Sequence, residues 1–133
     1  MLSFWRRWAW IATAILVGLA LAACGNGGSE SAIGDPAQGR QIYETGGASG
    51  VPCLTCHTLD GSALVGPSFQ GIAGRAGTRV EGLSAEEYLR QSILEPTAYV
   101  VEGFEPTMPE TYADTLSEDD INNVIAFLLS LPD

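Results

Sequence analysis

Two cysteines and a histidine lie within five consecutive residues, Cys-Leu-Thr-Cys-His at positions 53–57. Such a cluster can form a short disulfide, bind a metal ion, or hold a cofactor attached through the two sulfurs. A redox-active cysteine pair requires a strand-rich fold, and a structural zinc ion requires four ligands. The surrounding sequence therefore decides between these possibilities, and with them the fold.

The first 23 residues of the 133-residue chain differ from the remainder. Arg6 and Arg7 lie among aromatic residues, and an apolar segment follows as far as Ala23, which is the pattern of an export signal. This segment leads into Leu-Ala-Ala-Cys at 21–24, which resembles the lipobox of bacterial lipoproteins. The resemblance implies cleavage before Cys24 and attachment of a diacylglycerol to its thiol.

Two other interpretations of this segment remain open. The apolar run from Trp8 to Ala23 could be an uncleaved membrane helix, although a span usually needs about 20 residues. Ordinary signal cleavage would instead release a soluble protein with an unpaired thiol. All three interpretations place the mature chain outside the cytoplasmic membrane. We therefore expect a signal peptide at 1–23, a small, polar and flexible tether at 24–34, and one folded domain at 35–133.

The chain from residue 24 onward is strongly acidic. It contains four arginines, no lysine and all 16 aspartates and glutamates, so that its formal charge is 4 − 16 = −12. This charge excludes nucleic acid as a partner on electrostatic grounds and favours partner proteins with basic patches.

Capping signals predict three helices, which begin at Asp35, Ser84 and Ser117. The first should extend to about Glu44 and the second to Glu95, where a following proline disfavours further helix. In the third, apolar residues recur with the period of one helix face. No alternating strand pattern is present in the sequence. The fold class is therefore predicted to be all-α with long loops.

The predicted loops, 46–83 and 96–116, leave three modest helices to form the core of a domain of about 100 residues. Such a core is thin for its size. A buried apolar cofactor would complete it.

With no strands for a redox-active pair and no fourth ligand for zinc, Cys-x-x-Cys-His is interpreted as the attachment site of one haem c. Its two thioethers would form at Cys53 and Cys56, and His57 would lie beneath the iron. A disulfide would leave the histidine unexplained.

From about Asp35 to Pro132 the chain resembles a monohaem class I cytochrome c. The resemblance implies that fold, with three main helices and short helical turns around one covalently bound haem. The stretch 88–109 is most similar to cytochrome c modules of bacterial respiratory complexes, whereas the glycine-rich segment 46–52 departs from the family pattern. The resemblance also implies that Gly39 permits close approach of the first and last helices. The matching segments are GRQIYE at 39–44, CLTCH at 53–57, Gly66-Pro67, YLRQSILEP at 88–96, TMPE at 107–110 and INNVIAFLLSL at 121–131.

The axial ligands of the iron follow by elimination. His57 is the only histidine, the chain has no lysine, and Met108 is the only methionine besides Met1. Met108 lies between Pro106 and Pro109, whose fixed φ angles stiffen the loop. We therefore expect His57 as the proximal ligand and Met108 as the distal ligand, a combination that raises the reduction potential.

The resemblance implies further cofactor-binding residues. The carbonyl of Pro67 should accept a hydrogen bond from the second ring nitrogen of His57. Phe69 and Tyr99 are expected as walls of the haem pocket. Arg75 is expected either to pair with a haem propionate or to remain solvated.

An iron with both axial positions filled by the protein has no site for a substrate, so we expect an electron-transfer protein and not an enzyme. Its partners would be redox proteins or a membrane respiratory complex. It would act outside the cytoplasm, anchored to a membrane, as a carrier in a respiratory or photosynthetic chain. The alternatives are a fixed haem subunit of a quinol-oxidising or oxidase complex and, from a different class, a haem-based gas sensor or a peroxidase-like enzyme with an open iron face.

Overall fold

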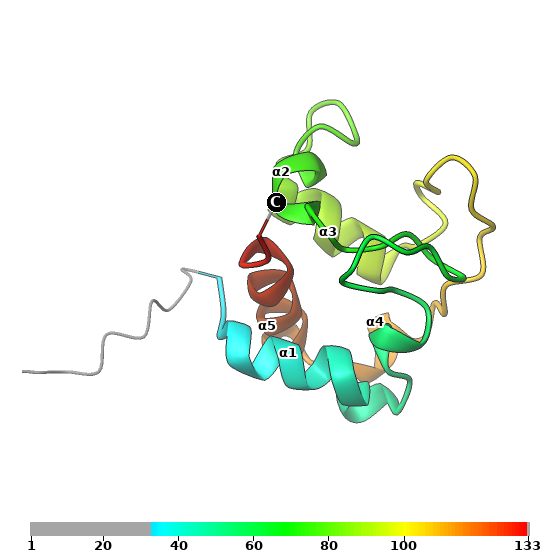
Figure 1. Cartoon of the computed structure of the whole chain (residues 1–133). Coiled ribbons are helices and arrows are strands. Elements are labelled where there is room, and N and C mark those ends of the chain that lie inside the picture. Colours follow the sequence, from blue (N-terminus) through cyan, green and yellow to red (C-terminus); the bar gives the residue numbers. More distant parts are fainter. Residues whose placement is uncertain (1–32, 133) are drawn as a thin grey trace, which may run out of the picture.

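The structure is a computed structural model that describes residues 33–132. The predicted signal peptide, Cys24 and most of the predicted tether lie outside these residues. The helices are α1 (Pro36–Thr45), α2 (Ile72–Ala76), α3 (Ala85–Leu94), α4 (Tyr112–Thr115) and α5 (Glu118–Leu129), as Figure 1 shows. Single 3-10 turns occur at Gly47–Ser49 and Cys53–Thr55.

The predicted all-α class is confirmed for the described part of the chain, where the only β-type pairing is an isolated bridge between His57 and Ala63. The three predicted helices correspond to α1, α3 and α5. Two further helices, α2 and α4, lie inside segments that were expected to be loops.

The ends of α1 follow from its sequence. The side chain of Asp35 accepts a hydrogen bond from the backbone N–H of Ala37 at 2.8 Å, and proline occupies the first helical position. The helix ends at Gly46, which has a φ of 82°. This left-handed conformation has a low steric cost only for glycine, so the helix ends where the sequence predicts.

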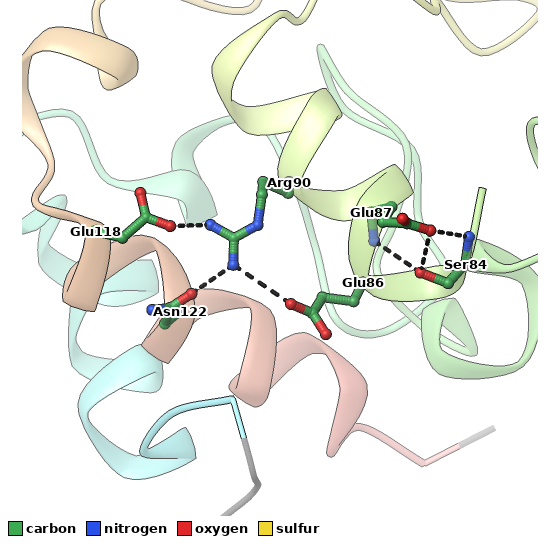
Figure 2. Close-up of polar contacts among 6 residues, drawn as sticks. All are labelled: Ser84, Glu86, Glu87, Arg90, Glu118 and Asn122. Carbon is green, nitrogen blue, oxygen red and sulfur yellow. Dashed lines mark hydrogen bonds and ion pairs between the residues drawn. The ribbon is translucent and has the colours of Figure 1, made fainter.

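Helices α3 and α5 both begin with a capping box. In α3 the Ser84 hydroxyl accepts from the Glu87 N–H at 3.3 Å, and the Glu87 carboxylate accepts from the Ser84 N–H at 2.8 Å (Figure 2). Ser117 and Asp120 repeat this arrangement in α5. Each box satisfies backbone donors that a helix start would otherwise leave without partners.

Helices α1 and α5 cross in direct backbone contact. A Cβ atom on Gly39 would lie 1.9 Å from the carbonyl oxygen of Asn123 and 2.8 Å from Cβ of Phe127. Only glycine fits at this crossing. The contact is fixed further by the backbone N–H of Asp35, which donates to Oδ1 of Asn123 at 2.7 Å.

A polar contact joins α3 to α5. The guanidinium of Arg90 on α3 donates to the carboxylate of Glu118 and, at 2.5 Å, to Oδ1 of Asn122, both on α5 (Figure 2). A weaker contact of 3.5 Å runs to Glu86 within α3. Arg90 therefore fixes how α3 lies against α5.

The buried core lies mainly between α1, α3 and α5. Its largest fully buried side chain is Ile125, at the centre of α5. The segments 46–71 and 95–111 lie on the side of this core away from the start of α1 (Figure 1). No helix within residues 33–132 is both long and apolar enough to cross a membrane.

Candidate functional site

One pocket brings together all the described residues that the sequence predicted for the site. It is lined by the motif 53–57, the segment 65–69, helix α3, the loop 99–109 and α5. The pocket wall is predominantly apolar, with Leu89, Ile93, Val124 and Leu128 behind the predicted site residues. The predicted members are Cys53, Cys56, His57, Pro67, Phe69, Arg75, Tyr99 and Met108.

The two cysteines lie at either end of a tight turn. The backbone N–H groups of Cys56 and His57 both donate to the carbonyl oxygen of Cys53, at 3.1 and 2.9 Å. Both thiols are free, so the pair is not joined as a disulfide. Burial raises the pKa of Cys53 to about 11, which keeps this thiol protonated at neutral pH. The turn thus presents both free cysteines to an apolar pocket.

The imidazole of His57 is held in one protonation state by its backbone partner. Nδ1 lies 2.7 Å from the carbonyl oxygen of Pro67, which can only accept, so Nδ1 carries the proton. Burial lowers the pKa of His57, against a smaller opposing effect of this hydrogen bond. The ring is therefore neutral at pH 7, and its Nε2 has a lone pair available to a metal.

Two neighbours fix the plane of this imidazole. Phe69 stacks on His57 with ring centroids 4.4 Å apart and 8° between the planes. On Gly66 a Cβ atom would lie 2.4 Å from Cε1 of His57, so a side chain there would displace the ring. Gly66-Pro67 is one of the segments that resemble the family, but the sequence did not predict this contact.

Helix α1 contacts the motif through the side chain of Tyr43. The hydroxyl of Tyr43 donates to the carbonyl oxygen of His57 at 2.9 Å, and its ring lies 6.2 Å from that of Phe69. The sequence places Tyr43 on α1, but no local signal reveals its contact with a residue 14 positions later.

Met108 lies half-buried in the loop that forms another wall of the pocket, and it packs against the core. Tyr99 also lines the pocket and contacts Tyr88 of α3 edge-on, with centroids 5.9 Å apart. At the end of this loop, the hydroxyl of Tyr112 donates to the carbonyl oxygen of Val51 at 3.1 Å. This bond ties the methionine loop to the segment that precedes the cysteines.

Two arginines lie at the pocket. The guanidinium of Arg75 donates to the carbonyl oxygens of Ser68 and Gln70. Arg79 also lines the pocket, and its Nε is buried without a hydrogen-bond partner. The sequence did not predict Arg79 as a pocket residue, because Arg79 lies beyond the end of α2 and no local pattern marks it.

These observations test whether the pocket suits a haem. Two free thiols, a neutral imidazole and a thioether are the groups that attach and ligate a haem, and the apolar wall suits a porphyrin. The unpartnered Nε of Arg79 suits an anionic substituent. Among the described residues, no three His, Cys, Asp or Glu side chains are grouped as an amino-acid metal site requires. The pocket therefore fits a haem attached through both cysteines.

An all-α fold around a pocket that contains Cys-x-x-Cys-His defines a c-type haem protein. The chain matches the cytochrome c family over residues 36–132 and belongs to that family. No curated protein matched the chain. Cytochrome c domains are typical of proteins that transfer electrons to and from other redox proteins, and the family implies a haem c held covalently by Cys53 and Cys56.

Proposed function

We propose that this chain is a monohaem class I cytochrome c that carries single electrons between redox proteins on the outer face of a membrane. The observation that supports it best is the pocket, in which the cysteines, the neutral imidazole and the single thioether of the described chain lie together. A haem bound here supplies an iron that gains or loses one electron.

In this proposal each ligand residue has a distinct task. Cys53 and Cys56 would hold the haem through thioether bonds, and His57 would bind the iron through Nε2. The Pro67 carbonyl and the Phe69 ring keep the imidazole in one orientation, so that it need not move when the iron changes charge. Met108, which also lines the pocket, would supply its thioether as the other ligand of the iron. A soft thioether favours ferrous iron and raises the reduction potential.

The ligand assignment is tested with Met108→Ala. We expect this variant to lose the methionine–iron charge-transfer band of the oxidised protein and to bind carbon monoxide when reduced, whereas the wild type should not bind it. Met108→His is the matched control, because it should restore a closed iron at a lower potential. A wild-type protein that binds carbon monoxide readily would contradict the proposal and favour the gas sensor or peroxidase-like enzyme.

Membrane attachment is the second part of the proposal. It is supported by the lipobox-like Leu-Ala-Ala-Cys at 21–24, which lies outside the described residues. Mass spectrometry of the native protein should find a diacylglycerol on Cys24 and a chain that begins there. Cys24→Ser should remove the lipid and leave haem attachment at Cys53 and Cys56 unchanged. A mature chain with a different start and no lipid would refute the anchor.

The tethered carrier must also be distinguished from a fixed subunit of a respiratory complex. The proposed carrier has a flexible tether at 24–34, which would let the domain move between partners. Purification from membranes in mild detergent separates the two. A carrier should elute alone, whereas recovery in fixed stoichiometry with a larger quinol-oxidising or oxidase complex would show a subunit.

A further inference from the structure

The Met108 loop, residues 105–110, has few hydrogen bonds of its own. Within these residues the structure describes one backbone hydrogen bond, in which the Thr107 N–H donates to the carbonyl oxygen of Glu105 at 2.8 Å. Two prolines in the loop restrict its φ angles, but they do not attach it to the rest of the domain. Apart from the packing of Met108 against the core, the attachment of this loop must therefore come from residues that flank it.

Helix α4 follows the Met108 loop closely and begins with Tyr112. The side chain of Tyr112 is buried, and its hydroxyl donates to the carbonyl oxygen of Val51 at 3.1 Å. Val51 lies 61 positions earlier in the chain and just before Cys53. This hydrogen bond therefore joins the end of the Met108 loop to the segment that leads into the attachment motif.

The segment that contains the acceptor is held in place by its own contacts. A Cβ atom on Gly46 would lie 2.5 Å from the backbone nitrogen of Val51, so the chain folds back onto the end of α1 with no room for a side chain. The Ser49 hydroxyl donates to the carbonyl oxygen of Gly46 at 2.6 Å and accepts from the Val51 N–H at 3.2 Å. The Val51 carbonyl is therefore a fixed acceptor, and Tyr112 attaches the Met108 loop to it.

A second tyrosine makes a similar bond at the other end of the motif. The hydroxyl of Tyr43 donates to the carbonyl oxygen of His57 at 2.9 Å. The ring of Tyr43 lies 5.5 Å from that of Phe127 on α5, so this bond connects the motif to the helical core and not to the Met108 loop. The two hydroxyls make the same kind of bond but attach different parts of the domain. Tyr43 therefore offers a matched comparison for Tyr112.

We propose that Tyr112 is a positioning residue that keeps Met108 at the iron, because its hydroxyl attaches the Met108 loop to the segment before the cysteines. When this bond breaks, the loop can move away from the pocket, and the iron becomes open to small ligands on that side. The inference rests on the proposed haem site with Met108 as a ligand. If the wild type carries no covalent haem or no methionine–iron charge-transfer band, the proposed function fails. The role of Tyr112 is tested by differences between haem-containing proteins that show this band.

The test measures how tightly the ferric protein binds added imidazole, which must displace Met108 to reach the iron. The apparent affinity depends on the fraction of molecules in which the iron is open. Tyr112→Phe keeps the ring and removes only the donor. We expect this variant to bind imidazole about tenfold more tightly than the wild type, because one lost hydrogen bond changes an equilibrium on that scale. Its charge-transfer band should also disappear at a lower temperature on warming.

Two further variants separate the hydrogen bond from other effects of the substitution. Tyr43→Phe is the matched control, because it removes the same hydroxyl from the bond at the His57 end of the motif. Its affinity for imidazole should stay close to that of the wild type. Tyr112→4-aminophenylalanine keeps a hydrogen-bond donor at the position of the hydroxyl. It should return the affinity for imidazole toward the wild-type value.

A tyrosine that only fills the core would make Tyr112→Phe less resistant to denaturant and leave its affinity for imidazole unchanged, and this result would overturn the proposal. An equal gain of affinity in Tyr43→Phe would overturn it as well, because the effect would then not depend on the Met108 loop. If Tyr112→Phe fails to retain haem, Tyr112→4-aminophenylalanine decides. Retention of haem with an affinity near that of the wild type supports the hydrogen bond, whereas loss of haem in this variant too would count against it.

Discussion

The helical core and the two loop segments that complete the pocket are built in different ways. In the core, α1 and α5 touch through backbone at Gly39, and α5 contributes an almost continuous set of buried side chains. The segments 46–71 and 95–111 instead contain the large hydrophobic side chains that remain exposed. These are Val51, Leu54, Leu64, Val65 and Val100, which are 37–56% accessible.

This difference indicates where each region obtains its stability. The core buries apolar surface between its own helices, and capping boxes satisfy the starts of α3 and α5. The loops are held by scattered hydrogen bonds around a pocket, such as the one from Tyr112 to Val51. We infer that the core can form from the polypeptide alone, whereas the loops need the haem as their apolar centre.

The largest expected effect comes from removing the cofactor. A variant with Cys53→Ala and Cys56→Ala cannot attach haem. Backbone amides in 46–71 and 95–111 should then exchange with solvent much faster than in the haem-containing protein, while amides of α1 and α5 should keep part of their protection. Hydrogen exchange read by mass spectrometry measures both regions at once. Equal loss of protection in core and loops would show that the two regions are one cooperative unit.

The next largest effect should come from Gly39→Ala, which places a side chain at the contact between α1 and α5 in the core. The new Cβ would overlap the backbone carbonyl of Asn123, so α1 and α5 must separate, with a loss of about 3 kcal/mol in the free energy of unfolding. Denaturant unfolding of the haem-containing protein measures this loss. Gln41→Ala is the control, because Gln41 is exposed on the same helix. A loss below about 1 kcal/mol would contradict the close crossing.

A smaller effect is expected from Arg90→Met, which removes the polar contact between α3 and α5. The Arg90 side chain is 27% accessible and that of Glu118 is 69%, so solvent screens their attraction. With the added bond to Asn122, the loss should be about 1 kcal/mol. Arg40→Met serves as a comparison, since Arg40 pairs only with exposed Glu44 within α1. Equal losses in the two variants would show that the contact between helices adds nothing.

The smallest effect concerns acid pH and the start of α3. The hydrogen bond from the Ser84 hydroxyl, followed by that from the Ser84 N–H, lowers the pKa of Glu87. Because the folded protein prefers the carboxylate, this contribution to stability is present above the pKa of Glu87 in the unfolded chain and disappears as the pH falls through its folded value. In Ser84→Ala the pKa of Glu87, followed by NMR, should rise toward its ordinary value. An unchanged pKa would mean that the capping box is absent in solution.

Local signals in the sequence predicted the elements that depend on neighbouring residues. The caps at Asp35, Ser84 and Ser117 predicted α1, α3 and α5 with starts that agree with the structure. The resemblance implied short helical turns beside the three main helices, but the positions of α2 and α4 were not predicted, because they span five and four residues and show no periodic pattern. Their positions depend on packing against the rest of the fold.

The sequence predicted the reactive groups that line the pocket. It did not predict the residues that hold these groups in place. Spacing and elimination predicted the cysteines, His57 and Met108 as site residues, because each is chemically distinctive and rare in this chain, and all four line the pocket. The bond from Tyr43 to the His57 carbonyl and the unpartnered nitrogen of Arg79 depend on how distant segments meet. Nothing in the sequence around Tyr43 or Arg79 encodes such a meeting.

The bond between Asp35 and Asn123 has a mechanical consequence. It fastens the beginning of the described domain to the middle of α5, and Figure 1 places this point on the side of the molecule away from the loop 95–111. A force applied to the chain before Asp35 would act on α1 and α5 and not on the loops. If the proposed tether holds the domain at a membrane, the domain would rotate about this attachment point. The pocket loops lie on the opposite side of the domain, so this rotation would move them over the largest distance and bring them into contact with partners.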